Sequence, residues 1–179
     1  MRLVRRARLS AAAVLAAAAL TCPAQAQPVS EDALKAAFLY NFAKFTTWPA
    51  EAPGAPLALC VVGDGAVAGA LQQIVHGHTV DGRDVAVHQL GRDANLRSCH
   101  VLYLPGDDAQ LVASVVAGLK GAPVFTVADG RGAPDAGVVA GLFVEGGRMR
   151  FVINVAAAQH ARLQISSKVL ALGEDHARR

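Results

Sequence analysis

The stretch Leu34-Lys-Ala-Ala-Phe-Leu-Tyr-Asn-Phe-Ala-Lys-Phe-Thr-Thr-Trp-Pro49 decides how the rest of the chain is interpreted. It holds four of the nine aromatic residues before its end, and the single tryptophan closes it. Four large apolar side chains recur at spacings of three and four residues: Leu34, Phe38, Phe42 and Phe45. This spacing places them on one face, so the stretch is predicted to be an amphipathic helix packed on a core.

The flanking residues define both ends of this predicted helix. Ser30 is suited to cap the first turn, and Glu31 and Asp32 put negative charge where the helix dipole favours it. Pro49 disfavours helical geometry at Trp48, which predicts that the helix ends there.

Residues 1–26 have the organisation of a secretory signal peptide. Arginines at the start are followed by an Ala/Leu/Val run over 9–20 and by Ala24-Gln25-Ala26, an A-x-A cleavage signal. Cleavage between Ala26 and Gln27 would leave 27–179 as a single domain. A lipoprotein anchored through Cys22 is the weaker alternative, since Ala-Leu-Thr is a poor lipobox, and a retained membrane anchor would need a longer apolar run.

The basic character of the chain belongs to this leader. The full chain has 17 Lys and Arg against 14 Asp and Glu, and the leader contains four arginines and no acid. The mature part therefore has 13 basic and 14 acidic residues, a net charge of −1, and nucleic acid is not expected as a partner.

Two cysteines, Cys60 and Cys99, remain in the mature part. In an oxidising compartment an even pair favours a disulfide over two free thiols. The loop closed by that bridge would contain about 40 residues, for which the chain-entropy model gives on the order of 4 kcal/mol of stabilisation.

The remaining chain alternates between strand and helix patterns. Strands are expected at 57–62, 83–90, 99–104 and 124–127; helices at 66–75, 109–119, 156–163 and 166–172; and a hairpin at 138–145 and 148–154 around Gly146-Gly147. Residues 174–179 are expected to be a loose charged tail. The alternation predicts an α/β domain, a three-layer sandwich with a mixed, mostly parallel sheet and a late antiparallel hairpin. A Cys60–Cys99 bridge would require the first and third strands to be close neighbours.

Two motifs suggest ligand or metal binding. Gly63-x-Gly65-x-x-Ala68 follows a strand and opens a helix, as in dinucleotide-binding folds, but Asp64 stands where a pyrophosphate would lie, which favours a simple tight turn. His76 and His78 have the alternate spacing of metal ligands, although the absence of a free cysteine beside them favours a solvated turn.

Two further motifs suggest catalysis. His100 beside Cys99 could form a thiol–imidazole pair, but a bridged cysteine is no nucleophile, which favours a packed or capping histidine. Ser166-Ser167-Lys168 resembles S-x-x-K only loosely, and hydroxyl capping of a helix is favoured. No catalytic, metal-binding or cofactor-binding residue is therefore assigned.

Several strings together resemble the YfiR/HmsC-like periplasmic family, in order along nearly the whole mature chain. They are the opening stretch ending in Trp48-Pro49, Leu59-Cys60-Val61-Val62-Gly63, Val80-x-Gly82-Arg83-x-Val85, the Ser98–Leu104 segment, Val127-x-Asp129 with Gly137, Gly147-Arg148-Met149-Arg150-Phe151-x-Ile153-Asn154, and the Leu163–Leu172 segment.

This resemblance implies a non-enzymatic periplasmic regulator that represses an inner-membrane diguanylate cyclase by binding its periplasmic sensor region. It would lower cyclic-di-GMP and biofilm formation, and an outer-membrane-associated protein would relieve the repression. The resemblance also carries over Cys60 and Cys99 as the stabilising disulfide of the family. A second cysteine pair found in some members is missing, so redox control through that pair does not transfer.

Other expectations accompany this hypothesis. A homodimer is expected as a further assembly. The alternative function is a periplasmic small-ligand-binding domain that uses the crevice near Gly63 to Gly65 and Pro105 to Asp108, at the ends of two strands. A third hypothesis, an exported thiol or hydrolytic enzyme, would need Cys99 or His100 for activity.

Overall fold

The computed structural model describes residues 29–49, 54–63, 65–106 and 108–175; the expected signal peptide and its cleavage site lie outside these ranges. The described helices are α1 (Glu31–Lys44), α2 (Gly65–Val75), α3 (Ala109–Gly118), α4 (Val155–His160) and α5 (Ser167–Leu172), with short 3-10 helices η1 (Leu96–Ser98) and η2 (Ala133–Ala136). The strands are β1 (Thr46–Thr47), β2 (Leu57–Val62), β3 (Thr79–Val80), β4 (Arg83–Leu90), β5 (Val101–Leu104), β6 (Phe125–Asp129), β7 (Ala140–Glu145), β8 (Arg148–Ile153), β9 (Gln164–Ile165) and β10 (Glu174–Asp175).

The main sheet has the order β10-β8-β7-β6-β5-β2-β4-β3. The five strands at its centre, β4, β2, β5, β6 and β7, run parallel, and β8 and β3 are antiparallel to their neighbours β7 and β4. The prediction of a mixed, mostly parallel sheet with a late hairpin is confirmed. The central order is that of a doubly wound sheet: β4 is added on one side of β2, and β5, β6 and β7 are then added on its other side.

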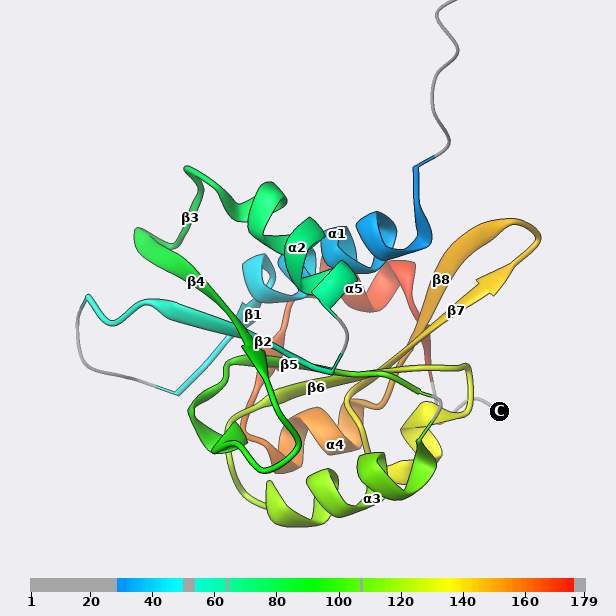
Figure 1. The fold of residues 1–179 in the computed structure, drawn as a ribbon. Helices are drawn as coiled ribbons and strands as arrows, with labels where there is room; N and C mark the ends of the chain where they lie inside the picture. The colour runs from blue at the N-terminus through cyan, green and yellow to red at the C-terminus, as the bar shows by residue number, and fades with distance from the viewer. Residues whose placement is uncertain (1–28, 50–53, 64, 107, 176–179) are drawn as a thin grey trace, which may run out of the picture.

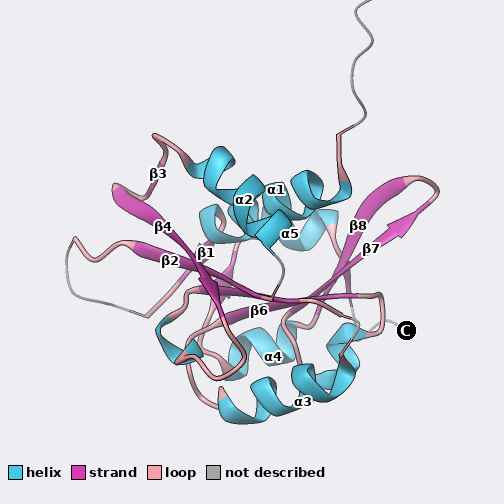
Figure 2. Cartoon of the chain, in the orientation of Figure 1, coloured by secondary structure: helices cyan, strands magenta, loops and turns pink. Residues whose placement is uncertain are grey.

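Helices cover both faces of this sheet, which confirms the predicted three layers. Figures 1 and 2 show α1, α2 and α5 on one side of the strands and α3 and α4 on the other. Successive residues of β2 alternate between the two resulting cores: Leu59 and Val61 belong to the α1 side, and Cys60 and Val62 to the α3 side. Strands buried on both faces account for their unbroken apolar sequences.

Helix α1 packs its aromatic side chains on strands from the second half of the chain. The ring of Phe42 stacks on Phe125 of β6 with centroids 5.0 Å apart, and Phe38 lies 5.5 Å from Phe151 of β8. The most buried face includes Ala36, Leu39, Phe42 and Ala43, whereas Leu34 is only half-buried. Compared with the predicted apolar face, the buried face of α1 is rotated toward Ala36 and Ala43. These small side chains let the helix approach the core closely.

The N-terminus of α1 follows the prediction, and its C-terminus does not. The Ser30 side chain accepts a hydrogen bond from the Ala33 N–H. The helix ends at Lys44, four residues before Trp48, because Thr46 and Thr47 form β1 and pair with β9. The expectation that Pro49 ends the helix was wrong, since pairing with a distant segment ends it first.

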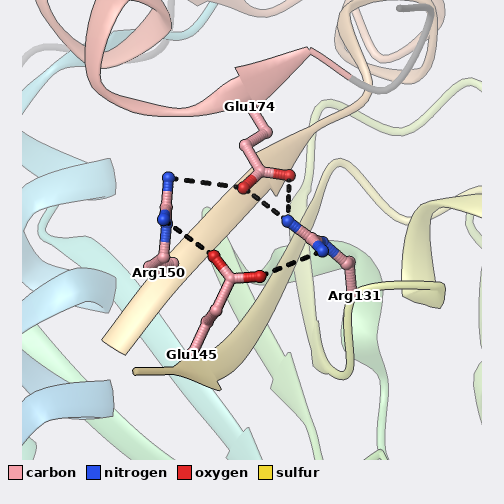
Figure 3. A network of polar contacts seen from close by, with 4 residues as sticks. All are labelled: Arg131, Glu145, Arg150 and Glu174. Carbon is pink, nitrogen blue, oxygen red and sulfur yellow. Dashed lines mark hydrogen bonds and ion pairs between the residues drawn. The ribbon is translucent and has the colours of Figure 1, made fainter. Parts of the chain in front are cut away.

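The expected loose tail was also wrong for Glu174 and Asp175, which form β10 and pair with β8. Figure 3 shows Glu174 facing Arg131 and Arg150. Arg131 contacts both carboxylate oxygens of Glu174 at 2.7 Å, and Glu145 bridges the same two arginines at 3.1 and 2.7 Å. These side chains are partly exposed, so the network contributes more to the position of β10 than to stability.

The two turns of the antiparallel pairs follow the sequence differently. Glu145 pairs with Arg148 around Gly146 and Gly147, which have φ of 58° and 72°, so the predicted two-residue primed turn is confirmed. Strand β3 was not expected; it pairs with β4 across a turn at Asp81 and Gly82.

Cys60 and Cys99 form a disulfide, with their Cα atoms 5.9 Å apart. The bridge joins β2 to the segment that precedes β5, and these strands are direct neighbours, as the sequence required. Cys99 itself lies before β5, which begins at Val101 instead of at residue 99. Both cysteines belong to the core on the α3 side and are 3% exposed.

Replacing both cysteines (Cys60→Ala with Cys99→Ala) is expected to lower the free energy of unfolding by on the order of 4 kcal/mol, because the bridge spans 39 residues of the unfolded chain. Urea denaturation of a chain that starts at Gln27 would measure the change. The wild-type protein held in reductant serves as the matched control and should lose stability similarly. Unchanged denaturation midpoints would contradict a stabilising bridge.

Candidate functional site

A polar cluster lies where β5 and β6 end, at the carboxyl edge of the parallel strands. The Tyr103 hydroxyl donates a hydrogen bond of 2.6 Å to Oδ2 of Asp129, and Lys35 Nζ contacts the same oxygen at 2.9 Å. Tyr103 comes from β5, Asp129 ends β6, and Lys35 lies on α1. The cluster therefore joins the first helix to two central strands.

Lys35 is held from both sides. Its ammonium group contacts Glu31, one turn earlier on α1, at 2.9 Å, and lies 6.0 Å from the centre of the Tyr103 ring. Only 13% of its side chain is exposed, so it is mostly shielded from water and has two carboxylates as partners. A buried lysine needs such partners because an isolated buried charge is costly.

Gly106 brings the loop after β5 against the loop after β6. A Cβ atom at Gly106 would lie 2.3 Å from the carbonyl oxygen of Asp129 and 2.6 Å from its Cβ. Any side chain there would force the two loops apart. The glycine thus sets the close approach that encloses the Asp129 side chain.

One oxygen of this carboxylate has no partner. Asp129 Oδ1 is buried and accepts no hydrogen bond from the described residues, whereas Oδ2 accepts two. An unsatisfied buried acceptor is uncommon and destabilising. The cluster therefore retains capacity for one more N–H or O–H donor.

The surroundings hold both proton donors of the cluster in their protonated forms. Burial raises the pKa of Tyr103, and the hydrogen bond to Asp129 raises it further. Burial lowers the pKa of Lys35, but its hydrogen bonds to Glu31 and Asp129 outweigh this effect and raise the pKa overall. Near neutral pH neither group can serve as a base or a nucleophile. The contacts of Lys35 and Tyr103 with Asp129 hold α1 against β5 and β6, and we call these three residues the polar latch.

The sequence did not single out these three residues as a site. Asp129 ends a buried strand and Lys35 follows Glu31 by four residues, and both features are visible in the sequence. Their contact joins positions 94 residues apart, which no local pattern predicts.

His100 directly precedes β5, at the amino edge of the parallel strands and thus opposite to the polar cluster. Only 7% of it is exposed. Its Nδ1 accepts a hydrogen bond from the Ala58 N–H at 3.0 Å, and its Nε2 lies 3.0 Å from the guanidinium of Arg83. The Trp48 ring meets it edge-on, with centroids 5.5 Å apart. Of the two alternatives, a packed or a capping histidine, the structure confirms the packed one, and the bridged Cys99 offers it no thiol.

His76 and His78 lie in an exposed turn. The Nδ1 atom of His78 is 3.0 Å from the backbone carbonyl of His76, and its ring meets Tyr40 edge-on. Among residues 29–49, 54–63, 65–106 and 108–175, no group of three or more His, Cys, Asp or Glu side chains is arranged to hold a metal ion. The turn interpretation therefore fits the geometry better than a metal site does.

Gly63 makes the tight turn expected after β2, with φ of +90°. A Cβ on it would lie 3.6 Å from Cγ of Pro105, so the loops after β2 and β5 meet, as the crevice hypothesis assumed. Asp64 and Asp107 of these loops lie outside the described residues. At the other end of the chain Ser166 caps α5 by accepting a hydrogen bond from the Lys168 N–H, as predicted.

The chain belongs to the YfiR/HmsC-like family, whose model matches residues 32–174. The coarse role indicated by this family is that of a periplasmic regulatory protein. A search of curated proteins found no match. Within the described ranges, no helix combines the length and the apolar composition needed to cross a bilayer.

Two solved structures share the fold. A conserved domain protein from Vibrio cholerae O1 biovar El Tor has a TM-score of 0.56 and 13% identity, over 82% of this chain and 60% of that chain. An ABC domain from Streptococcus pneumoniae, solved in complex with L-Trp, has a TM-score of 0.52 and 10% identity, over 76% of this chain and 58% of that one. The chain spans about three fifths of each structure, and at these identities the likeness concerns the fold alone.

Tyr103→Phe is expected to lower the free energy of unfolding by about 1–3 kcal/mol near neutral pH, because a hydrogen bond to a charged acceptor is lost. It should also flatten the alkaline loss of stability. Since folding raises the pKa of Tyr103, stability that is fully present below the unfolded value of about 10 is lost as pH rises above it. Urea midpoints at about pH 8 and about pH 11 would measure both effects.

Tyr40→Phe is the matched control, since it leaves the Tyr103–Asp129 hydrogen bond in place. Lys35 acts in the same direction as Tyr103, so some alkaline loss should persist in Tyr103→Phe. An alkaline loss equal in wild type and Tyr103→Phe would show that the latch hydrogen bond has no such role.

Proposed function

We propose that the mature chain is a periplasmic regulator that represses an inner-membrane diguanylate cyclase by binding its periplasmic sensor region. The observation that carries this proposal is the YfiR/HmsC-like family match over residues 32–174, which reaches from the first turn of α1 to the first residue of β10. Repression would lower cyclic-di-GMP and with it biofilm formation. An outer-membrane-associated protein that relieves the repression, and a homodimer, belong to the same proposal.

Such a regulator needs no catalytic group of its own. It needs a surface that binds one state of the sensor more tightly than the other, because a ligand with equal affinity for both states shifts nothing. The polar latch suits this role, since it fixes α1 against the sheet and keeps the domain in one arrangement.

The surface that we assign to the partner lies on α5. The described residues include four large apolar side chains with substantial exposure: Val29, Val144, Leu170 and Leu172. Two of them share α5, and Leu172 is 81% exposed. Leu172 is the most exposed of the four, and we assign the partner contact to this large apolar side chain.

The first experiment compares cellular cyclic-di-GMP in a strain deleted for this gene with the same strain complemented. We expect a rise on deletion that is reversed by the full-length gene and not by one lacking residues 1–26, because only the exported form would meet the sensor. An unchanged level, with the host cyclases expressed, would refute the repressor function.

Leu172→Ser should weaken repression while leaving the free energy of unfolding within about 0.5 kcal/mol of wild type, since surface substitutions rarely cost more. The readouts are cyclic-di-GMP in the complemented strain and unfolding of the purified mature domain. Lys168→Ser is the matched control, because Lys168 is an exposed residue of the same helix. Full repression by Leu172→Ser would move the partner surface away from α5.

A further inference from the structure

A pocket of about 580 Å³ lies between α3 and α4, on the face of the sheet opposite to α1. Figure 1 shows the two helices together beneath the strands. Its apolar lining comes from both helices and from the strand starts above them, and includes Val116, Leu119, Val124, Val139, Ala157 and Ala161. This size and lining are typical of sites for small organic molecules.

The uncharged polar groups of the pocket already have protein partners. The Thr126 hydroxyl accepts a hydrogen bond from the Val139 N–H at 3.0 Å. The Asn154 side chain accepts from the Ala157 N–H at 2.9 Å and donates to the Pro134 carbonyl at 3.2 Å. The interior therefore offers a ligand mainly apolar contact.

The charge of the pocket has one sign. Lys120 and His160 are its titratable lining residues, and none of its described lining residues is acidic. Neither side chain forms a hydrogen bond or ion pair within the described part of the chain. Both can therefore reach a ligand without giving up a partner.

Two arginines add to this positive edge. Arg97 donates to the carbonyl of Gly118 at 2.6 Å, and Arg162 donates to the carbonyl of Gly121 at 3.2 Å. The Gly118 carbonyl lies at the C-terminal end of α3, where the helix dipole is negative, and Gly121 lies in the turn that follows the helix. Because Arg97 already donates to a carbonyl at the negative end of α3, the ammonium group of Lys120 is not needed there and can bind an anion.

We propose that this pocket binds a small amphipathic carboxylic acid, with its apolar body between α3 and α4 and its carboxylate on Lys120 and His160. An apolar lining excludes a purely polar anion, and the positive edge disfavours an amphipathic cation. The proposal does not depend on the repressor function, because it concerns the layer of helices on the opposite face from α5.

The probes are decanoate, hexanoate and decyltrimethylammonium, each below its critical micelle concentration, titrated calorimetrically into the mature chain. Decanoate should bind at least about tenfold more tightly than hexanoate, because each buried methylene is worth about fourfold in affinity, or about 0.8 kcal/mol. Decyltrimethylammonium should bind at least about tenfold more weakly than decanoate, since the charge of its head group is opposite.

Variants locate the site. Lys120→Gln should weaken decanoate binding about tenfold while keeping the preference for the longer chain. Ala157→Leu, at a partly exposed position of the lining, should fill the pocket and remove binding. Lys168→Gln is the matched control, because Lys168 is exposed on α5 across the sheet.

Thermal unfolding and far-ultraviolet circular dichroism of each variant would show that it is folded. Three results would overturn the proposal. They are no binding of decanoate by the folded wild type, equal binding of decanoate and decyltrimethylammonium, and equal losses in Lys120→Gln and Lys168→Gln.

Discussion

The packing of α1 onto the centre of the sheet is the contact on which the rest of the structure depends. Phe42 stacks on Phe125, and Phe38 meets Phe151, so the first described helix covers strands β6 and β8 from the second half of the chain. The ion pair of Lys35 with Asp129 and the pairing of β1 with β9 also join segments that are far apart in the sequence. One layer is therefore complete only after nearly all of the chain is in place, which requires closing long loops before their contacts stabilise the fold.

Elements stabilised by local pattern could be predicted from the sequence, and those created by a distant partner could not. Strands β2 and β4 and the hairpin turn at Gly146-Gly147 follow their predicted limits, because apolar runs and turn glycines carry the information locally. Strands β1, β9 and β10 contain two residues each, too few for a periodic signal, and they exist only through pairing. The same limit explains the wrong end of α1 and the expected loose tail.

The candidate sites divide in the same way. The Cys60–Cys99 pair could be proposed from residue type and compartment, and the neighbouring positions of β2 and β5 agree with it. The latch could not, since each of its members has an ordinary local role. Lys35 is one polar residue on an amphipathic helix, Tyr103 one residue of an apolar strand, and Asp129 a strand end. The pairing of β5 with β6 and the packing of α1 on the sheet bring Tyr103 and Lys35 to the same carboxylate oxygen of Asp129.

The two proposed surfaces lie on opposite faces of the sheet, which constrains any communication between them. A ligand in the α3–α4 pocket could change partner binding at α5 only by favouring one of two arrangements of an element that both sites contact. The central strands are poor candidates, because they are buried on both faces and their packing leaves little room for movement. The C-terminal segment is better suited. Helix α4 lines the pocket, β9 follows it and pairs with β1, and α5 begins two residues after β9 ends, so a small displacement of α4 would reach α5 through a short, hydrogen-bonded connection.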